Sequence, residues 1–158
     1  VTLSADSTID ASATEHGDGG QVVLWSAVNN ASSVTAVHGT ISAMAGANGG
    51  NGGQVETSGH TLKMAGLSVN TESQNGVTGL WLIDPYDISI GDSSSGTGFS
   101  ASGSDYTYTS AAGSYIKASD IATALNSSNI TIQWNITESI IEAVVHILIT
   151  TIKDGVSR

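Results

Sequence analysis

Three histidines recur at equal intervals and are the first residues whose spacing suggests chemistry. They are His16, His38 and His60, and imidazoles stacked on successive turns of a coil are suitable transition-metal ligands. Each lies next to a glycine, however, in a different local context, and the strand pattern does not place them at equivalent positions. We therefore expect solvated corner residues and neither a metal ladder nor a bound cofactor.

Two neighbouring carboxylates, Asp84 and Asp87, suggest the acid pair of a glycoside hydrolase. Sites that cleave acidic polysaccharides usually place basic side chains nearby, and Lys63 and Lys117 are the only basic residues before the C-terminal tail. We expect the two aspartates to shape a turn and the chain to have no catalytic residues.

The glycine-rich run at 46–53 is a weaker candidate for ligand binding. No Lys-Ser/Thr pair follows it, as a phosphate-binding loop requires, and it lacks the Asp-bearing nonapeptide rhythm of calcium-binding β-rolls. The sequence also contains no Gly-x-Ser-x-Gly elbow between a strand and a helix. A corner loop is the simplest interpretation of the run.

Two tryptophans are the candidate ligand contacts. Trp25 and Trp81 face outward if their apolar neighbours Leu24, Leu80 and Leu82 face the interior. Exposed aromatic rings are platforms for sugars or protein partners. The alternative is that neighbouring loops cover both rings.

The composition excludes several classes of partner. Only 11% of the residues are charged, against about 25% in typical domains, and four basic residues against 14 acidic ones give a net charge of −10. No basic patch is available to neutralise phosphates, so we expect no binding of nucleic acid or of anionic membrane surfaces. The absence of cysteine excludes disulfides and thiolate metal sites.

A duplicated segment predicts how these residues are positioned. Gly17–Val22 returns as Gly50–Val55, and each copy follows a strand-like segment, Thr8–Ala13 and Thr40–Ala45. The second copy follows the first at an interval of about 33 residues. Repetition at such an interval indicates a stacked architecture, in which each unit buries its apolar face against its neighbours. The motif residues are Gly19, Gly20 and Val22 in the first copy and Gly52, Gly53 and Val55 in the second.

Alternating apolar residues predict nine short strands in three sets. The first set is Thr8–Ala13, Gln21–Ser26 and Ser33–Val37; the second is Thr40–Ala45, Gln54–Ser58 and Thr61–Met64; the third is Leu67–Thr71, Leu80–Ile83 and Ile88–Ile90. Each set would form one turn of an all-β parallel β-helix, a solenoid with three faces. The alternative all-β interpretation is a sandwich or barrel, which would need hairpins and would not explain the duplication.

The pattern loosens after Asp92, and we divide the chain into β-helix repeats over 1–92, a looser continuation over 93–134 and an atypical tail over 135–158. Residues 91–103 are interpreted as a surface excursion and 106–109 as an edge strand. A short helix is expected over 118–125 with Ser119 as its N-cap, followed by a strand at 130–134. The tail has apolar residues at helical spacing from Ile140 to Ile152, which predict a short amphipathic helix or a capping segment. The run is too short to span a bilayer.

The ordered motifs resemble the filamentous-haemagglutinin-type adhesins, the large exoproteins of bacterial two-partner secretion. Gly39–Ala43, Gly52–Gly59 and Leu80–Pro85 carry the resemblance, and Gly20–Ser26 and Ile121–Ile132 are also similar. It covers about residues 7–134 and is strongest over 17–90, whereas the sequence from Glu138 onward does not follow the repeats.

The resemblance implies a right-handed parallel β-helix, export through an outer-membrane transporter partner, a secreted or cell-surface location, and attachment to a glycan or protein receptor of another cell. In such a coil, glycines would accept φ > 0 at the corners. Asp84-Pro85 would end a strand, because proline cannot donate to a ladder. Two other functions stay open, a β-helix carbohydrate-active enzyme and a structural spacer between functional domains.

Overall fold

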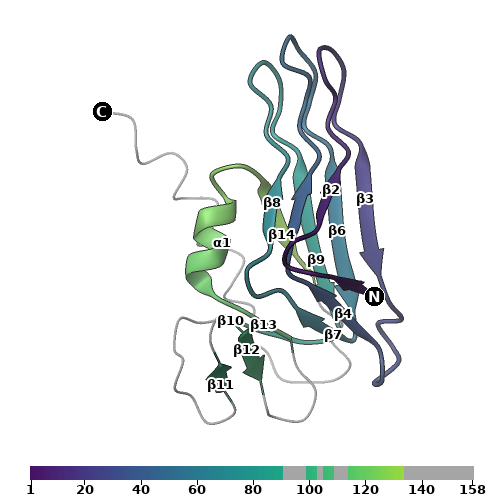
Figure 1. The fold of residues 1–158 in the computed structure, drawn as a ribbon, viewed down its shortest axis with the longest axis vertical. Helices are drawn as coiled ribbons and strands as arrows, with labels where there is room; N and C mark the ends of the chain where they lie inside the picture. Colours follow the sequence, from purple (N-terminus) through teal and green to yellow (C-terminus); the bar gives the residue numbers. More distant parts are fainter. Residues whose placement is uncertain (91–98, 103–104, 109–113, 134–158) are drawn as a thin grey trace.

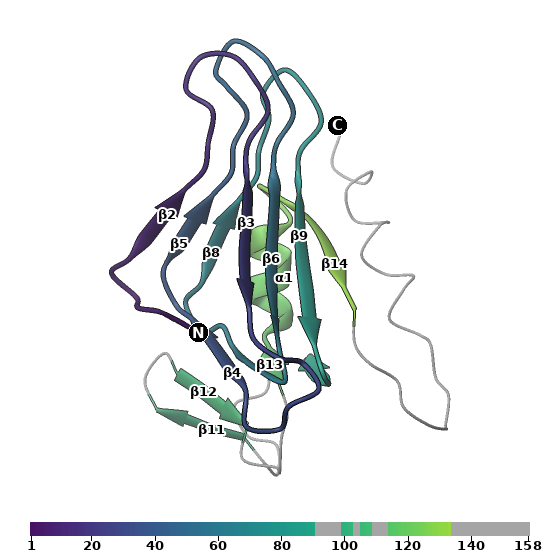
Figure 2. The same cartoon turned by 90° about the vertical axis from the view of Figure 1, so that its right-hand side faces the viewer.

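Parallel β-strands are the main secondary structure in the part of the chain that the structure describes. The computed structural model describes residues 1–90, 99–102, 105–108 and 114–133, and within them the chain forms three parallel sheets, one antiparallel pair and one short helix (Figures 1 and 2). The prediction of an all-β chain with parallel strands is confirmed. Trp134 and the amphipathic tail lie outside the described residues.

The strands are distributed over sheets of five, four and three strands. The five-stranded sheet has the order β1 (Thr2–Leu3), β4 (Val34–Val37), β7 (Thr61–Lys63), β13 (Ser114–Ile116), β10 (Ile88–Ile90). The four-stranded sheet has the order β14 (Asn129–Ile132), β9 (Leu80–Pro85), β6 (Gln54–Gly59), β3 (Gln21–Trp25). The three-stranded sheet has the order β2 (Thr8–Asp10), β5 (Thr40–Ser42), β8 (Ser68–Asn70), and β11 (Phe99–Ser102) pairs antiparallel with β12 (Asp105–Tyr108).

The chain visits the three sheets in a fixed cycle. From β2 to β10 it passes from the three-stranded to the four-stranded to the five-stranded sheet, three times in succession. Each predicted set of three strands therefore places one strand in each sheet. In Figure 2, β2, β5 and β8 lie side by side, as do β3, β6 and β9.

The two copies of the duplicated segment are direct neighbours. Ile9 pairs with Ile41 and Val22 pairs with Val55 in parallel register, which confirms that the copies stack as predicted. The next step along the chain is shorter, because the residue that pairs with Val55 on its other side is Trp81.

The interior is filled by side chains from alternate positions of each strand. Ile9, Ile41 and Val69 form one column across the three-stranded sheet, and Val22, Val55 and Trp81 form another across the four-stranded sheet. The buried apolar core comprises Val22, Val37, Ile41, Ala43, Val55, Leu62, Met64, Val69, Trp81, Ile83, Ile116 and Ile121.

In the described residues, Gly17, Gly49, Gly50 and Gly66 have positive φ, as we expected of glycines at the corners. The motif glycines Gly19, Gly20, Gly52 and Gly53 do not, and they are required for close packing. A Cβ on Gly19, Gly52 or Gly53 would instead collide with a backbone carbonyl oxygen, that of Ala43, Thr71 or Gly20 respectively, and one on Gly20 would lie 3.0 Å from the Ala11 oxygen. Glycine is needed there because two backbones approach too closely for a side chain.

Gly20 and Gly53 occupy the same place in successive loops, and Gly79 repeats it in the third. Their N–H groups donate to Ala11, Ala43 and Thr71 at 2.7, 2.7 and 2.8 Å respectively. The carbonyl of Gly20 accepts from Gln54 N, and that of Gly53 from Leu80 N, both at 3.0 Å. This closes the neck of each loop and stacks it on the next, as the three parallel loops in Figure 1 show.

The segment after residue 113 departs from the cycle. β13 lies between β7 and β10, so these two strands are not neighbours, and neither β11 nor β13 was predicted. The expected helix exists as α1 (Ala118–Ala124), but its N-cap is Lys117 and not Ser119. Asp120 N and Ile121 N both donate to the Lys117 carbonyl at 3.1 Å, so the first turn closes on the backbone without a side-chain cap.

The turn that follows α1 covers the free edge of β8 through Ser127 and Ser128 (Figure 1). The Ser128 hydroxyl accepts from Thr71 N at 3.2 Å and lies 3.3 Å from the Val69 carbonyl, and the Ser127 hydroxyl donates to the same carbonyl at 3.1 Å. Thr71 N also donates to Ser127 O at 3.0 Å. Edge groups that would otherwise be open to another strand are thus satisfied.

Candidate functional site

Trp25 lies exposed on the outer face of the four-stranded sheet. Val22 and Leu24 point into the interior, so Trp25 points away from it and is 56% exposed. Its neighbours across the sheet are Ser58 on β6 and then Asp84 on β9, directly opposite in register. The prediction of an outward-facing Trp25 is confirmed.

Glu56 lies on the same face, two positions before Ser58. It pairs with Val23 on one side and Leu82 on the other, and the Ser58 hydroxyl donates to Glu56 Oε1 at 2.6 Å. This bond holds the Glu56 carboxylate at Ser58, the residue that lies between Trp25 and Asp84 in the register of the sheet. We call the exposed parts of Trp25, Glu56 and Asp84 the Trp25 surface.

The Asp84 carboxyl has a raised pKa within this surface. Partial burial raises its pKa above the ordinary 3.8, and the Glu56 charge raises it further. The Asp84 and Glu56 carboxyl groups offer several hydrogen-bond acceptor oxygens side by side on this face. Together with an exposed indole, these groups suit a ligand rich in hydroxyls, such as a sugar.

The expectation that Trp81 also faces outward is wrong. Trp81 is only 2% exposed, and its indole Nε1 donates to the Thr57 hydroxyl at 3.1 Å. The reason is the register of β9, which aligns Trp81 with Val55 and Ile83 with Thr57 in the interior. Its neighbours in the strand, both leucines, are half-buried on the outer face.

The histidines do not gather, and two of them are not the solvated residues that we expected. His16 is exposed, whereas the Nδ1 of His38 lies 2.9 Å from Ala65 O. His60 is buried, with Nδ1 2.9 Å from Val28 O and its ring stacked on Tyr86 at 4.6 Å between centroids. Both rings link adjacent turns. In the described ranges, no three His, Asp or Glu side chains form a group that could hold a metal.

Asp87 has a different role from Asp84. Ser114 N donates to Asp87 Oδ1 at 3.3 Å, which ties β13 to the residues before β10. The carboxylate that acts on Asp84 is Glu56, a partner that sequence reasoning missed. The two are close because β9 pairs with β6 at a shorter offset than the one between β6 and β3, and the duplicated segment reveals only the longer offset.

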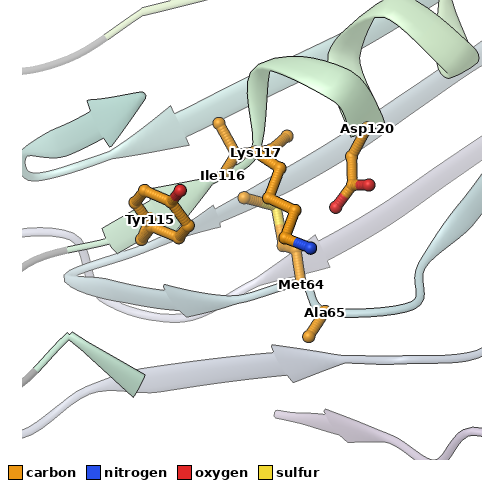
Figure 3. A pocket seen from close by; sticks show the side chains of 6 residues that line it. All are labelled: Met64, Ala65, Tyr115, Ile116, Lys117 and Asp120. Carbon is orange, nitrogen blue, oxygen red and sulfur yellow. The ribbon is translucent and has the colours of Figure 1, made fainter. Parts of the chain in front are cut away.

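A shallow pocket lies between the start of α1 and the end of β7, on another part of the molecule. Figure 3 shows the six residues that line it: Met64, Ala65, Tyr115, Ile116, Lys117 and Asp120. The Lys117 ammonium and the Asp120 carboxylate stand at its rim. None of the site residues predicted from the sequence lines it, so the Trp25 surface is the stronger candidate.

The described part of the chain contains no helix with the length and hydropathy needed to cross a bilayer. Comparison with protein-family models, with curated proteins and with solved structures finds no match for this chain.

Proposed function

We propose that this chain is a segment of a secreted or cell-surface bacterial adhesin, wound as a right-handed parallel β-helix. The observation that carries the proposal is the direct stacking of Val22 on Val55, with the outer face of the same strands presenting Trp25. The threefold cycle of strands among three sheets supports the winding. Export through an outer-membrane transporter is part of the proposal and follows from the resemblance.

The mechanism is presentation without chemistry. A sugar ring would stack on the Trp25 indole, while the Glu56 and Asp84 carboxyl groups would accept hydrogen bonds from its hydroxyls. The net charge of −10 disfavours polyanionic receptors. Neutral or amino-bearing glycans are therefore the expected ligands, with a protein receptor as the less favoured choice.

The test is binding of the folded chain to an array of neutral, amino-bearing and acidic glycans. We expect Trp25→Ala to weaken binding of the neutral or amino-bearing class by at least about tenfold, as truncation of an aromatic anchor does. Val23→Ala is the matched control, because Val23 is on the same strand and face and is 47% exposed. If no glycan or cell binds, the spacer interpretation replaces the adhesin proposal.

A carbohydrate-active enzyme is the second candidate, and the Asp84–Glu56 pair favours it. One carboxyl with a raised pKa beside a second carboxylate is the arrangement that glycoside hydrolysis uses. A reducing-end assay on a panel of polysaccharides tests this candidate. Turnover that is lost in both Asp84→Ala and Glu56→Gln would establish an enzyme and overturn the adhesin proposal.

A further inference from the structure

Four Asn-x-Ser/Thr triplets occur in the chain, and three of them lie within the described ranges. These are the acceptor pattern for N-linked glycosylation. The triplets begin at Asn30, Asn126, Asn129 and Asn135, and the last lies outside the described residues. Because transfer needs the asparagine amide and the hydroxyl two positions later to be accessible together, the fold decides which triplet can react.

The triplet Asn30-Ala31-Ser32 is exposed to solvent. It lies in the turn between β3 and β4, and all three residues are exposed. Asn30 Oδ1 accepts from Ser32 N at 3.0 Å, which holds the Asn30 side chain against the backbone of the residue that supplies the hydroxyl. Neither Asn30 Nδ2 nor the Ser32 hydroxyl hydrogen-bonds to another part of the chain that the structure describes.

The other two triplets are blocked by the fold. Asn126 is exposed, but Ser128, which supplies its hydroxyl, is fully buried on the edge of β8. Asn129 is the first residue of β14, and its Nδ2 donates to Thr78 O at 2.7 Å. Glycosylation at either position would first have to open these contacts, and would then place a bulky glycan against the sheet.

We propose that Asn30 is the N-glycosylation site in the part of the folded chain that the structure describes. The sugar donor is a hexose or oligosaccharide activated as a diphosphate, either of a nucleotide or of a lipid. Asn30 Nδ2 forms a bond to the anomeric carbon, the bond from that carbon to the diphosphate oxygen breaks, and the amide loses one proton to the enzyme's base. The diphosphate leaves, and no oxidant or reductant is needed. The site does not depend on the adhesin proposal.

The experiment treats the purified, folded chain in two arms. One arm uses a soluble sequon-reading glycosyltransferase with a UDP-hexose; the other uses an oligosaccharyltransferase with a lipid-linked oligosaccharide. Site occupancy is measured by peptide mass spectrometry, and an unstructured sequon peptide confirms that each enzyme is active. Ser32→Ala removes the acceptor hydroxyl, and Ser33→Ala is the matched neighbour control.

In at least one arm we expect Asn30 occupancy to exceed that of Asn126 and Asn129 by about tenfold or more, since each of those needs a native hydrogen bond opened. Ser32→Ala should abolish it and Ser33→Ala should leave it unchanged. Urea-unfolded chain should lose the preference. Asn30 left unmodified in both arms, or Asn129 modified equally in the folded chain, would overturn the proposal. The arm that succeeds identifies the class of donor.

Discussion

Trp81 and Thr57 form a hydrogen bond inside the protein, from indole Nε1 to hydroxyl Oγ1 at 3.1 Å. The Thr57 hydroxyl in turn points to the sulfur of Met64 at 3.8 Å. Both Trp81 and Thr57 are buried, so the bond satisfies two polar groups that have no access to water. It connects β6 to β9 through side chains as well as through the sheet.

Replacing Trp81 should therefore destabilise the fold strongly. Trp81→Ala should lower the free energy of unfolding by about 3–5 kcal/mol, and Trp81→Phe by about 1–3 kcal/mol because the Thr57 hydroxyl loses its donor. Trp25→Ala, on the exposed face, should change it by less than about 0.5 kcal/mol. Urea unfolding followed by circular dichroism measures all three, and equal losses for Trp25 and Trp81 would contradict their placement.

The glycine at the loop neck should not tolerate a side chain. Gly53→Ala drives a Cβ into the Gly20 carbonyl, and we expect a loss at or above the upper end of about 1–3 kcal/mol. Gly66→Asn is the control, because Gly66 has φ +75° and its nearest neighbour would be 3.9 Å away, and asparagine accepts this conformation. A thermal shift that is larger for Gly66→Asn than for Gly53→Ala would refute the close-packing explanation.

Asp84 should contribute more stability in acid than at neutral pH. Its pKa in the folded chain is above the ordinary 3.8, so its contribution is complete below that pH and is lost as the pH rises through the folded value. Asp84→Asn, which carries no charge, should exceed the wild type at neutral pH by less than about 1 kcal/mol, because the group is partly solvated. Glu56→Gln should lower the Asp84 pKa in an NMR titration; an unchanged value would exclude their coupling.

Asp10 should behave in the opposite sense. Hydrogen bonds from the Ser12 side chain and backbone, the latter at 2.9 Å, hold the pKa of Asp10 below 3.8. The stability that this gives is present above 3.8 and is lost as the pH falls through the folded value. Ser12→Ala should raise the Asp10 pKa toward its ordinary value in an NMR titration. Ser42→Ala, opposite Asp10 on β5, should leave it in place.

Ser128 should protect the edge of β8. Ser128→Ala removes the hydroxyl that contacts both Thr71 N and Val69 O, and we expect a loss of about 1–3 kcal/mol together with a greater tendency to aggregate. Thr123→Ala, on the exposed side of α1, should cost less than about 0.5 kcal/mol. Light scattering at matched unfolded fractions separates edge exposure from general instability. Equal aggregation of the two variants would count against the capping role.

The stacking of the first two turns could be predicted because the sequence repeats itself. Because the two copies of the duplicated segment have nearly the same sequence, stacking one on the other places Val22 opposite Val55. The orientation of Trp81 could not be predicted, because Leu80–Ile83 is apolar at every position. Without alternating polar residues, the sequence does not show which side chains of the strand face the interior. The direction of the Trp81 side chain is set by the register in which β9 pairs with β6, and no repeated segment in the sequence reveals that register.

The coupling of Asp84 to Glu56 and the position of β13 could not be predicted either, because both depend on pairing between strands that no repeat relates. β13 is a short strand whose Tyr115 pairs with Lys63, a residue far earlier in the chain. No local pattern can indicate such a partner. The glycine motif was identified correctly, but its cause lies in the distance between two backbones, which a sequence does not contain.

The insertion of β13 between β7 and β10 has a kinetic consequence. Strands β4 to β9 can assemble in the order in which they are synthesised, because each pairs with a strand that precedes it in the chain. β10 cannot be placed in its sheet until residues 114–116 have arrived between it and β7. This late, distant closure should be the slow phase of folding, and a chain emerging from the N-terminal end would wait at that step.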